Sequence, residues 1–535
     1  MCLALALTAR SWNVRDVFVE GRIYFIDADC YSRMSRAQIV SEHPGAIIRH
    51  HNFENWPQGV TPHTTAPLDY LIVGLKGVLD AGFAIFDADR TSVLREQTLD
   101  LAGALVSPIL GVSGLLFLAR WLWRFRVRFG ELALLFYAIS PVLVHGTQLG
   151  RPDHQALLIF LLTIAGGAEL TLAAPVTQGG PTVNRRLWGV LAGIVWALSL
   201  WVSLYEPFVL LVVVFALWMI ANRRSLWSRE RWPGVASGLM IMLIAFGIKG
   251  WRMIVPEATV LAYFGTWQQT IGELAYLDLL SPMLFAWLGW GIIAAPVLLI
   301  LARKADRRAL ALLAFVVVTF ALTLWQLRWG YFLALAFAWS LPWQLQALRR
   351  PWLVWSAFLL TLWPLFTDWD VRLFPDRMAQ DRAAMQRAEG VALRALAVST
   401  IGEKSGPFLA PWWLSPAISY WTRNPGVAGS SHQSLPGIVE TAKFFLSTTP
   451  EAAEHVLRER PVRWVFVDAP SRVISTSATL LAVPPPTAPL VSLLMERPED
   501  APSFLREWKG PASNRPDGLR FYRLYEVHFG GLAHE

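Results

Sequence analysis

Long apolar runs recur along the first two-thirds of the chain, and they constrain its fold more than any other feature. Each approaches the ~20 residues that a helix needs to cross the hydrocarbon core of a bilayer. Mean hydropathy is +0.41, and only 16% of the residues are charged, against ~25% in soluble domains. A single water-soluble domain is therefore excluded. The ten clear candidate spans are Leu99–Trp121, Glu131–His145, Ala156–Ala174, Leu187–Leu204, Phe208–Ala221, Val235–Ile254, Met283–Ala302, Ala309–Trp325, Trp329–Leu345 and Trp352–Phe366.

A shorter apolar stretch, Met1–Ala9, precedes these runs. It has about half the length of a span and lacks the basic start and cleavage site of a secretory signal. We expect it to be a first helix clipped by a late start codon. The expected fold class is thus a polytopic α-helical membrane protein with about eleven spans.

Lys and Arg residues fall in alternate loops, which predicts the orientation of the spans because cytoplasmic loops retain positive charge. Sixteen basic residues follow the even-numbered spans, whereas the intervening loops beyond the long first one hold only Arg151, Lys249, Arg252 and Arg328. Loops 10–98, 146–155, 205–207 and 252–282 and the tail are then extracytoplasmic. The protein is expected to be a multi-pass component of the cytoplasmic (inner) membrane. Topology explains the net charge of +8, so no nucleic-acid partner is needed.

The composition changes after residue 370, where charge rises and long apolar runs stop. We expect a transmembrane domain over 1–370 and an extracytoplasmic α/β domain over 371–535. The pattern predicts an amphipathic helix over Arg377–Ala397, strands at Pro407–Ala410 and Arg463–Asp468, and a helix over Pro450–Arg460. Two cysteines, Cys2 and Cys30, do not make a disulfide framework or a thiolate metal site.

Acidic residues at span boundaries are candidates for chemistry on the outward side. Asp27 and Asp29 lie in the first outward loop, and carboxylates two residues apart can share a divalent cation. The same spacing also fits a solvated loop with local Asp–Arg pairs. Asp153 and His154 stand where the fourth span begins. There they fit a helix cap with a surface imidazole, although ionisable groups near the membrane plane usually have a role.

Two further features lie on the same side. The loop at 252–282 has Glu273 near its centre, and long ordered loops tend to be functional. Arg328 stands at the outer start of a late span. It fits a side chain that snorkels to the headgroups or one whose planar fork binds phosphate. Together these groups predict a metal-assisted transfer from a phosphate-bearing donor, with Mg²⁺ or Mn²⁺ as cofactor.

The ordered set of motifs resembles the catalytic subunits of oligosaccharyltransferases, which are GT-C membrane glycosyltransferases. The first-loop motif of that family is matched best by Asp29, Tyr31 and Arg33, with Asp27 as an alternative aspartate. A Gly-x-x-Asp-His-His motif resembles 150–155, except that Gln155 replaces the second histidine. A Thr-Ile-x-Glu motif is similar to Thr270-Ile271-Gly272-Glu273, and the Arg-aromatic start of a late span is similar to Arg328-Trp329.

The resemblance implies roles for these residues. Asp29 and Glu273 would be catalytic, Asp29, Asp153 and His154 would hold the metal, and Arg328 would bind the donor diphosphate. Thr270, Trp412 and Trp413 would contact the acceptor. The family's Trp-Trp-Asp-aromatic-Gly motif is degenerate here, because Leu414 and Pro416 replace the Asp and the Gly. Since leucine accepts no hydrogen bond, the acceptor is left open as a protein, a lipid or a glycan.

The resulting prediction is transfer of a glycan from a polyprenyl-diphosphate carrier to an extracytoplasmic acceptor, with protein glycosylation as one form of it. One alternative is a GT-C transferase that uses a polyprenyl-monophosphate sugar. Another is a lipid or glycan transporter, but transporters usually carry inverted repeats and the sequence shows none. A catalytically dead scaffold is disfavoured because all three acidic positions are occupied.

Overall fold

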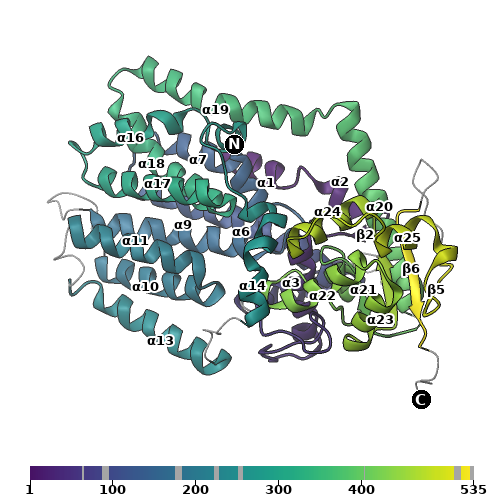
Figure 1. The fold of residues 1–535 in the computed structure, drawn as a ribbon. Helices are drawn as coiled ribbons and strands as arrows, with labels where there is room; N and C mark the ends of the chain where they lie inside the picture. Colours follow the sequence, from purple (N-terminus) through teal and green to yellow (C-terminus); the bar gives the residue numbers. More distant parts are fainter. Residues whose placement is uncertain are drawn as a thin grey trace.

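The structure, a computed structural model, describes residues 1–62, 66–86, 96–174, 184–221, 228–250, 257–402, 404–510 and 520–529. Within these ranges the apolar part of the chain forms a bundle of helices, and the C-terminal part lies beside one end of it (Figure 1). Some expectations fall outside these ranges. They concern residues 252–256 of the predicted outward loop, the end of the predicted span Val235–Ile254, and three basic residues, Arg223, Arg224 and Arg252.

The bundle is built from helices that match the apolar runs of the sequence. They are α6 (Thr98–Arg124), α7 (Gly130–Ile139), α8 (Pro141–Gly146), α9 (His154–Ala173), α10 (Arg185–Val202), α11 (Tyr205–Ala221), α13 (Trp232–Lys249), α15 (Pro282–Leu288), α16 (Gly291–Ala302), α17 (Arg308–Trp325), α18 (Gly330–Ala347) and α19 (Pro351–Leu373).

Five helices in the described ranges are long and apolar enough to cross a membrane, namely α6, α9, α10, α13 and α17. Counting the bent pair of α15 and α16 as one span gives up to six. The count of about eleven spans stays a prediction, because several apolar runs are interrupted. The run Glu131–His145 breaks at Ser140, since Pro141 has no N–H for a continuous helix. The run Met283–Ala302 bends by 55° at Gly289, whose φ is +71°.

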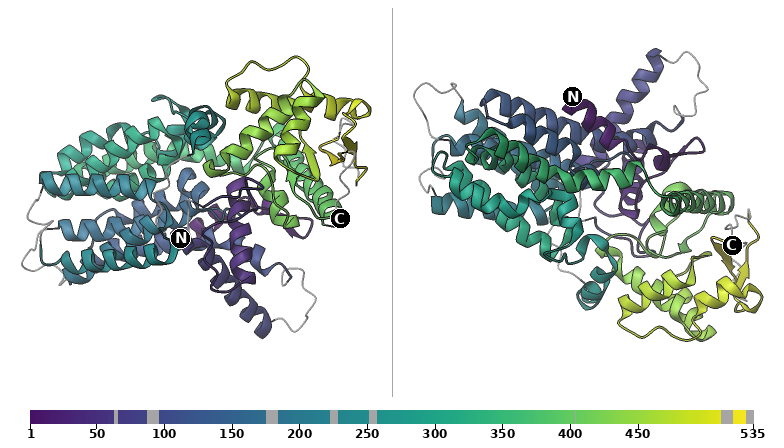
Figure 2. Two further views of the ribbon diagram at one scale, coloured as in Figure 1. Left: turned by 60° about the horizontal axis from the view of Figure 1, so that its bottom comes forward. Right: turned by 90° about the horizontal axis from the view of Figure 1, so that it is seen from above.

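Residues before the bundle fold into more structure than a loop. They form α1 (Cys2–Arg10), α2 (Val14–Val17), the hairpin strands β1 (Phe18–Val19) and β2 (Arg22–Ile23), α3 (Ala28–Glu42) and α4 (Pro67–Phe86). The last two helices lie in the stretch 10–98 that we expected as an outward loop. Figure 2 shows this early part of the chain against the bundle and close to the C-terminal elements.

The loop between α13 and α15 contains α14 (Ala258–Trp267) and two 3₁₀ turns, η1 (Gln268–Thr270) and η2 (Gly272–Leu274). A third turn, η3 (Leu327–Trp329), joins α17 to α18. The two loops are adjacent, because Leu277 N–H donates to Leu324 O and Leu327 N–H donates to Ala275 O. Glu273 in η2 and Arg328 in η3 therefore lie on one side of the bundle.

The C-terminal part has a small mixed sheet with the strand order β3-β4-β6-β5. Strand β3 is parallel to β4, and the other pairs are antiparallel. The predicted strands and helices are present as β3, β4, α20 and α23. The elements are α20 (Arg377–Ile401), β3 (Phe408–Leu409), α21 (Ser415–Thr422), η4 (His432–Ser434), α22 (Leu435–Leu446), α23 (Pro450–Glu459), β4 (Trp464–Val467), α24 (Pro470–Leu481), α25 (Leu490–Glu496), η5 (Pro498–Asp500), β5 (Leu505–Glu507) and β6 (Arg523–Val527).

Alternate residues of β4 pack into two different apolar clusters, one on each side of the sheet. Val465 and Val467 of β4 pack with α22 and α23, while Trp464 and Phe466 pack with α20. This alternation is the period of two expected for a strand between two layers. The region also contacts the first part of the chain, because Trp56 N–H donates to Gly426 O at 3.1 Å.

An ion pair buried between α3 and α4 holds the early part of the chain together. Arg33 Nη1 lies 2.8 Å from Asp69 Oδ1, and both side chains are 2% exposed. Arg36 Nε is 3.6 Å from the other carboxylate oxygen of Asp69. One carboxylate thus lies against two buried guanidinium groups.

We expect Asp69→Asn to lower the apparent melting temperature of the purified protein clearly, because removing one partner of a buried ion pair costs ~3–5 kcal/mol. Lys76→Gln on the same helix is the matched control, since it breaks only the partly exposed Lys76–Asp80 pair, worth ~0–1 kcal/mol. Thermal unfolding in detergent measures both. Equal small shifts for the two variants would show that the buried pair adds no stability.

Candidate active site

Two aspartates mark the beginning of α3. Asp27 is the N-cap, and its Oδ1 accepts the Cys30 N–H at 3.0 Å. Asp29 follows in the first turn, where the partial positive charge of a helix N-terminus favours a carboxylate. The Asp29 side chain remains open to solvent and accepts a hydrogen bond from Ser430 of the C-terminal part. The helix start therefore places two carboxylates on the side of the bundle that faces the C-terminal elements.

A third aspartate stands at the start of α9. Asp153 is the N-cap residue and is 5% exposed, and its Oδ1 lies 2.6 Å from His154 Nδ1. Burial alone would raise the pKa of Asp153, but His154 and Arg151 outweigh it and hold this pKa well below the usual range. Asp153 is thus ionised and already bound by its sequence neighbour.

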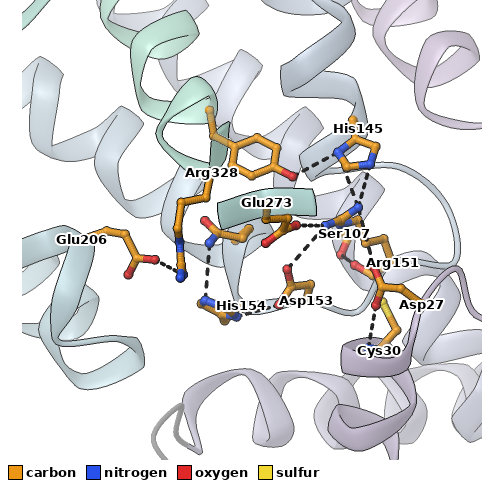
Figure 3. Close-up of polar contacts among 12 residues, drawn as sticks. Asp27, Cys30, Ser107, His145, Arg151, Asp153, His154, Glu206, Glu273 and Arg328 are labelled. Carbon is orange, nitrogen blue, oxygen red and sulfur yellow. Dashed lines mark hydrogen bonds and ion pairs between the residues drawn. The ribbon is translucent and has the colours of Figure 1, made fainter. Parts of the chain in front are cut away.

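Arg151 joins the acidic residues of three separate segments (Figure 3). Its Nη2 lies 2.7 Å from Glu273 Oε1 and 3.9 Å from Asp153 Oδ2, and its Nη1 lies 3.7 Å from Asp27 Oδ2. The same Nη1 lies 2.8 Å from His145 Nε2. Arg151 is 3% exposed. Burial would lower its pKa, but the surrounding acidic groups raise it, so the guanidinium stays charged.

Histidine and tyrosine side chains from the bundle hold Arg151 in place. His145 of α8 lies with its Nδ1 3.0 Å from the hydroxyl of Tyr331 on α18. Ser107 Oγ of α6 donates to the main-chain carbonyl of Arg151. Residues of three bundle helices, α6, α8 and α18, therefore hold Arg151 in position.

The negative charge of the cluster exceeds what Arg151 neutralises. Desolvation by the surrounding protein raises the pKa of the solvent-exposed Asp29 to about 7, with added repulsion from Asp27, Asp153 and Glu273. These interactions bring all four sequence-predicted carboxylates into one site. Among them, Asp29 is the group poised to take up or release a proton near neutral pH.

Arg328 lies beside this cluster with a partner of its own. Its guanidinium donates to Glu206, a residue of α11 that is fully buried, and it packs over the Tyr205 ring at 5.8 Å. Burial would lower the pKa of Arg328, but Glu206, Glu273 and Asp153 raise it. The Arg328 side chain remains 21% exposed, so this cation keeps donor groups available.

The residues predicted to contact an acceptor occupy different surroundings. Thr270 Oγ1 donates to Trp267 O at 2.7 Å, and Trp412 packs in the same apolar cluster as Trp267. Trp413 instead turns toward β4, where its indole N–H donates to Asp468 at 2.8 Å. Arg33, a secondary candidate, is paired with Asp69, and its charge adds to those of His154 and Arg151 in lowering the pKa of Asp153.

The arrangement differs from the metal centre expected from the sequence. In the ranges that the structure describes, no group of three His, Cys, Asp or Glu side chains is placed to hold a metal ion. Arg151 stands against Asp27, Asp153 and Glu273, and His154 Nδ1 faces Asp153. The side chains as placed therefore do not fit a divalent cation.

Sequence reasoning missed Arg151, Glu206 and Ser430 as parts of the site. Arg151 carried a signal, because it is one of only four basic residues in the outward loops that follow the long first loop. Glu206 carried a weaker one, as a lone acid at the start of an apolar run. Ser430 carried no signal in the sequence, since it is separated from Asp29 by most of the length of the chain.

Comparison with solved structures shows which known fold this chain shares. The crystal structure of the Archaeoglobus fulgidus oligosaccharyltransferase tethered with an acceptor peptide containing the NVT sequon matches with a TM-score of 0.65 at 15% identity. The match covers 100% of this chain and 74% of that chain. The archaeal oligosaccharyltransferase AglB from Archaeoglobus fulgidus, in complex with an inhibitory peptide and a dolichol-phosphate, matches with a TM-score of 0.63 at 16% identity and the same coverage.

A third structure is the Archaeoglobus fulgidus enzyme in complex with zinc and sulfate, with a TM-score of 0.55 at 17% identity. It covers 87% of this chain and 67% of that chain. No protein-family model and no curated protein sequence matches the chain. At these identities the likeness shows a shared fold, and the chain is thus built like a membrane oligosaccharyltransferase.

We expect the stability of the protein to depend on pH through Asp29. Its pKa is about 7 in the folded protein and ~3.9 for an unperturbed aspartate. The folded state therefore binds more protons between these values, and the free energy of unfolding falls as pH rises from about 4 to about 7. The Asp29→Asn variant has no carboxylate to ionise at this position, so its free energy of unfolding does not fall in this way as pH rises. Its apparent melting temperature in metal-free detergent should exceed that of the wild type by more at pH 8 than at pH 5.

Asp381→Asn on the exposed face of α20 is the control for this comparison, and its effect should be the same at both pH values. A difference between Asp29→Asn and the wild type that does not change with pH would contradict the raised pKa.

Proposed function

We propose that the protein is a membrane glycosyltransferase that moves a glycan from a polyprenyl-diphosphate carrier to an extracytoplasmic acceptor. The observation that carries this proposal is the meeting of four carboxylates and two guanidinium groups at one site. It occurs on a fold shared with the Archaeoglobus fulgidus oligosaccharyltransferase. The transfer breaks the bond between the sugar carbon and the diphosphate oxygen, and it forms a bond from that carbon to the acceptor.

Arg328 is proposed to bind the diphosphate of the donor. The leaving group gains negative charge as the glycosidic bond breaks, and a fixed guanidinium stabilises that charge without reorganising. Glu206 and the Tyr205 ring hold Arg328 in place, so its remaining N–H groups can face a ligand. Planar donors of this kind suit phosphate oxygens.

Asp29 and Glu273 are proposed to engage the nucleophilic group of the acceptor. Asp29 is open to solvent, and its pKa of about 7 suits a group that accepts a proton near neutral pH. The proton of the acceptor would pass to the Asp29 carboxylate as the new bond forms. Glu273, 37% exposed, lies across Arg151 from the aspartates and borders the same space.

The acceptor is proposed to approach from the C-terminal part. Ser430 donates to Asp29, which supports an extracytoplasmic location for the proposed domain 371–535 on the side of the active site. Leu414 is 7% exposed and packs in the apolar core of this region. The side chain at position 414 therefore does not accept a hydrogen bond from the acceptor, which is a protein, a lipid or a glycan.

We further propose that Arg151 supplies positive charge where the sequence predicts Mg²⁺ or Mn²⁺. A guanidinium bound to three carboxylates reduces their repulsion just as a bound cation would. The metal role of Asp29, Asp153 and His154 stays a prediction.

We expect Asp29→Ala and Glu273→Ala each to reduce glycan transfer at least ~100-fold, the scale of losing a proton-transfer group. Asp278→Ala, an exposed residue of the same loop, is the matched control and should retain activity. Product formation by purified protein with a native lipid extract measures the effect. Full activity in both acidic variants, with normal folding, would rule out the proposed roles.

We also expect Arg151→Gln to bind Mn²⁺ at least tenfold more tightly than the wild type, because the variant leaves Asp27, Asp153 and Glu273 without their cation. Arg151→Lys keeps the charge and should resemble the wild type. Electron paramagnetic resonance of free Mn²⁺ reports the affinity without any assay of activity. If the wild type binds Mn²⁺ tightly and Arg151→Gln binds it no more tightly, Arg151 does not take the place of a metal.

A further inference from the structure

A cavity lies inside the helical bundle, among α9, α10, α11, α17 and α18. Its volume is about 930 Å³, within the ~300–1,000 Å³ range of ligand pockets. Its walls are mainly aliphatic and aromatic, and they include Leu162, Ala165, Leu210, Val214, Leu313 and Phe332. None of the residues assigned to glycan transfer lines it.

One end of this cavity is strongly basic. Arg303, Lys304 and Arg307, from the turn between α16 and α17, line it and are exposed. In the described part of the chain their side chains form no hydrogen bond or ion pair, whereas Arg308 pairs with Asp306 at 2.7 Å. The lining carboxylate Glu169 is itself paired with Arg231 at 2.8 Å. Three cations at the cavity mouth are thus available to an anion.

The basic end is far from the candidate active site. Helix α17 has 18 residues and therefore extends for about 27 Å at 1.5 Å per residue. Its first residue, Arg308, packs over Trp343 near the end of α18 at 5.2 Å, whereas Arg328 follows its last turn. The cations of the cavity mouth and Arg328 therefore lie at opposite ends of the bundle, about one membrane thickness apart.

Two tryptophans also form part of the cavity wall. Trp196 and Trp339 line it and are 7% and 3% exposed. Their indole nitrogens are covered by protein atoms, so the two residues offer apolar ring surface to a ligand.

We propose that this cavity binds one anionic phospholipid from the membrane leaflet opposite the active site. The phosphate lies against Arg303, Lys304 and Arg307, as lipid headgroups do in basic pockets between membrane helices. An acyl chain fills the apolar walls toward Phe332.

The test compares lipids that share acyl chains and differ only in headgroup. The purified full chain is mixed with equal amounts of phosphatidylglycerol and phosphatidylcholine, and the retained lipid is identified by native mass spectrometry. We expect the wild type to retain one phosphatidylglycerol in at least tenfold preference. A variant with Arg303→Gln, Lys304→Gln and Arg307→Gln should lose this preference at least tenfold.

A variant with Arg349→Gln and Arg350→Gln is the matched control. These two exposed arginines follow α18 at the same end of the bundle but do not line the cavity, so lipid retention should not change. Ala311→Trp, which fills the cavity from α17, should displace both lipids while the charged mouth stays intact.

Several outcomes would overturn the proposal. One is equal retention of the two lipids, and another is an unchanged preference in the triple variant. Displacement of the lipid by millimolar inorganic phosphate would indicate a site for soluble phosphate. Displacement by a polyprenyl diphosphate, one for one, would assign the cavity to the tail of the glycan donor.

Discussion

The ion pairs of Arg151 with Asp27, Asp153 and Glu273 are the interaction on which the site depends. The three acids come from the start of α3, the start of α9 and the η2 turn, which are far apart in the sequence. Like charges gathered in a partly desolvated space repel one another strongly, so they can share this space only around a cation. Because Arg151 is buried and held by His145 and Ser107, the bundle itself fixes that cation.

The candidate active site also contacts the C-terminal part of the chain. Helix starts concentrate carboxylates at one end of α3 and α9, and Ser430 from the C-terminal elements donates to Asp29. Arg328 receives its own counter-charge from the buried Glu206 and so stays distinct from the Arg151 cluster. Two cations with separate partners can serve separate purposes, one within the acid cluster and one toward a donor phosphate.

Local patterns in the sequence predicted the apolar helices, the sheet strands β3 and β4, and the acids at the starts of helices. These features depend on residues close together in the chain. The partners of Arg151 and Arg328 could not be predicted, because Glu273 and Glu206 each lie 122 residues away from the arginine that they bind. The pairing of Arg33 could not be predicted for the same reason, since its partner Asp69 sits on a helix within a stretch expected to be a loop. The bend at Gly289 depends on close packing against Thr361, which only the fold reveals.

In the proposed reaction the carrier leaves as a polyprenyl diphosphate when the glycan is transferred. Mass spectrometry of the lipid that purified protein releases from a native lipid-linked glycan extract tests this step. We expect a free polyprenyl diphosphate that appears together with the glycosylated product. Release of a polyprenyl monophosphate would contradict the proposed donor, and glycan flux into proteoliposomes without any glycosidic product would contradict the proposed reaction.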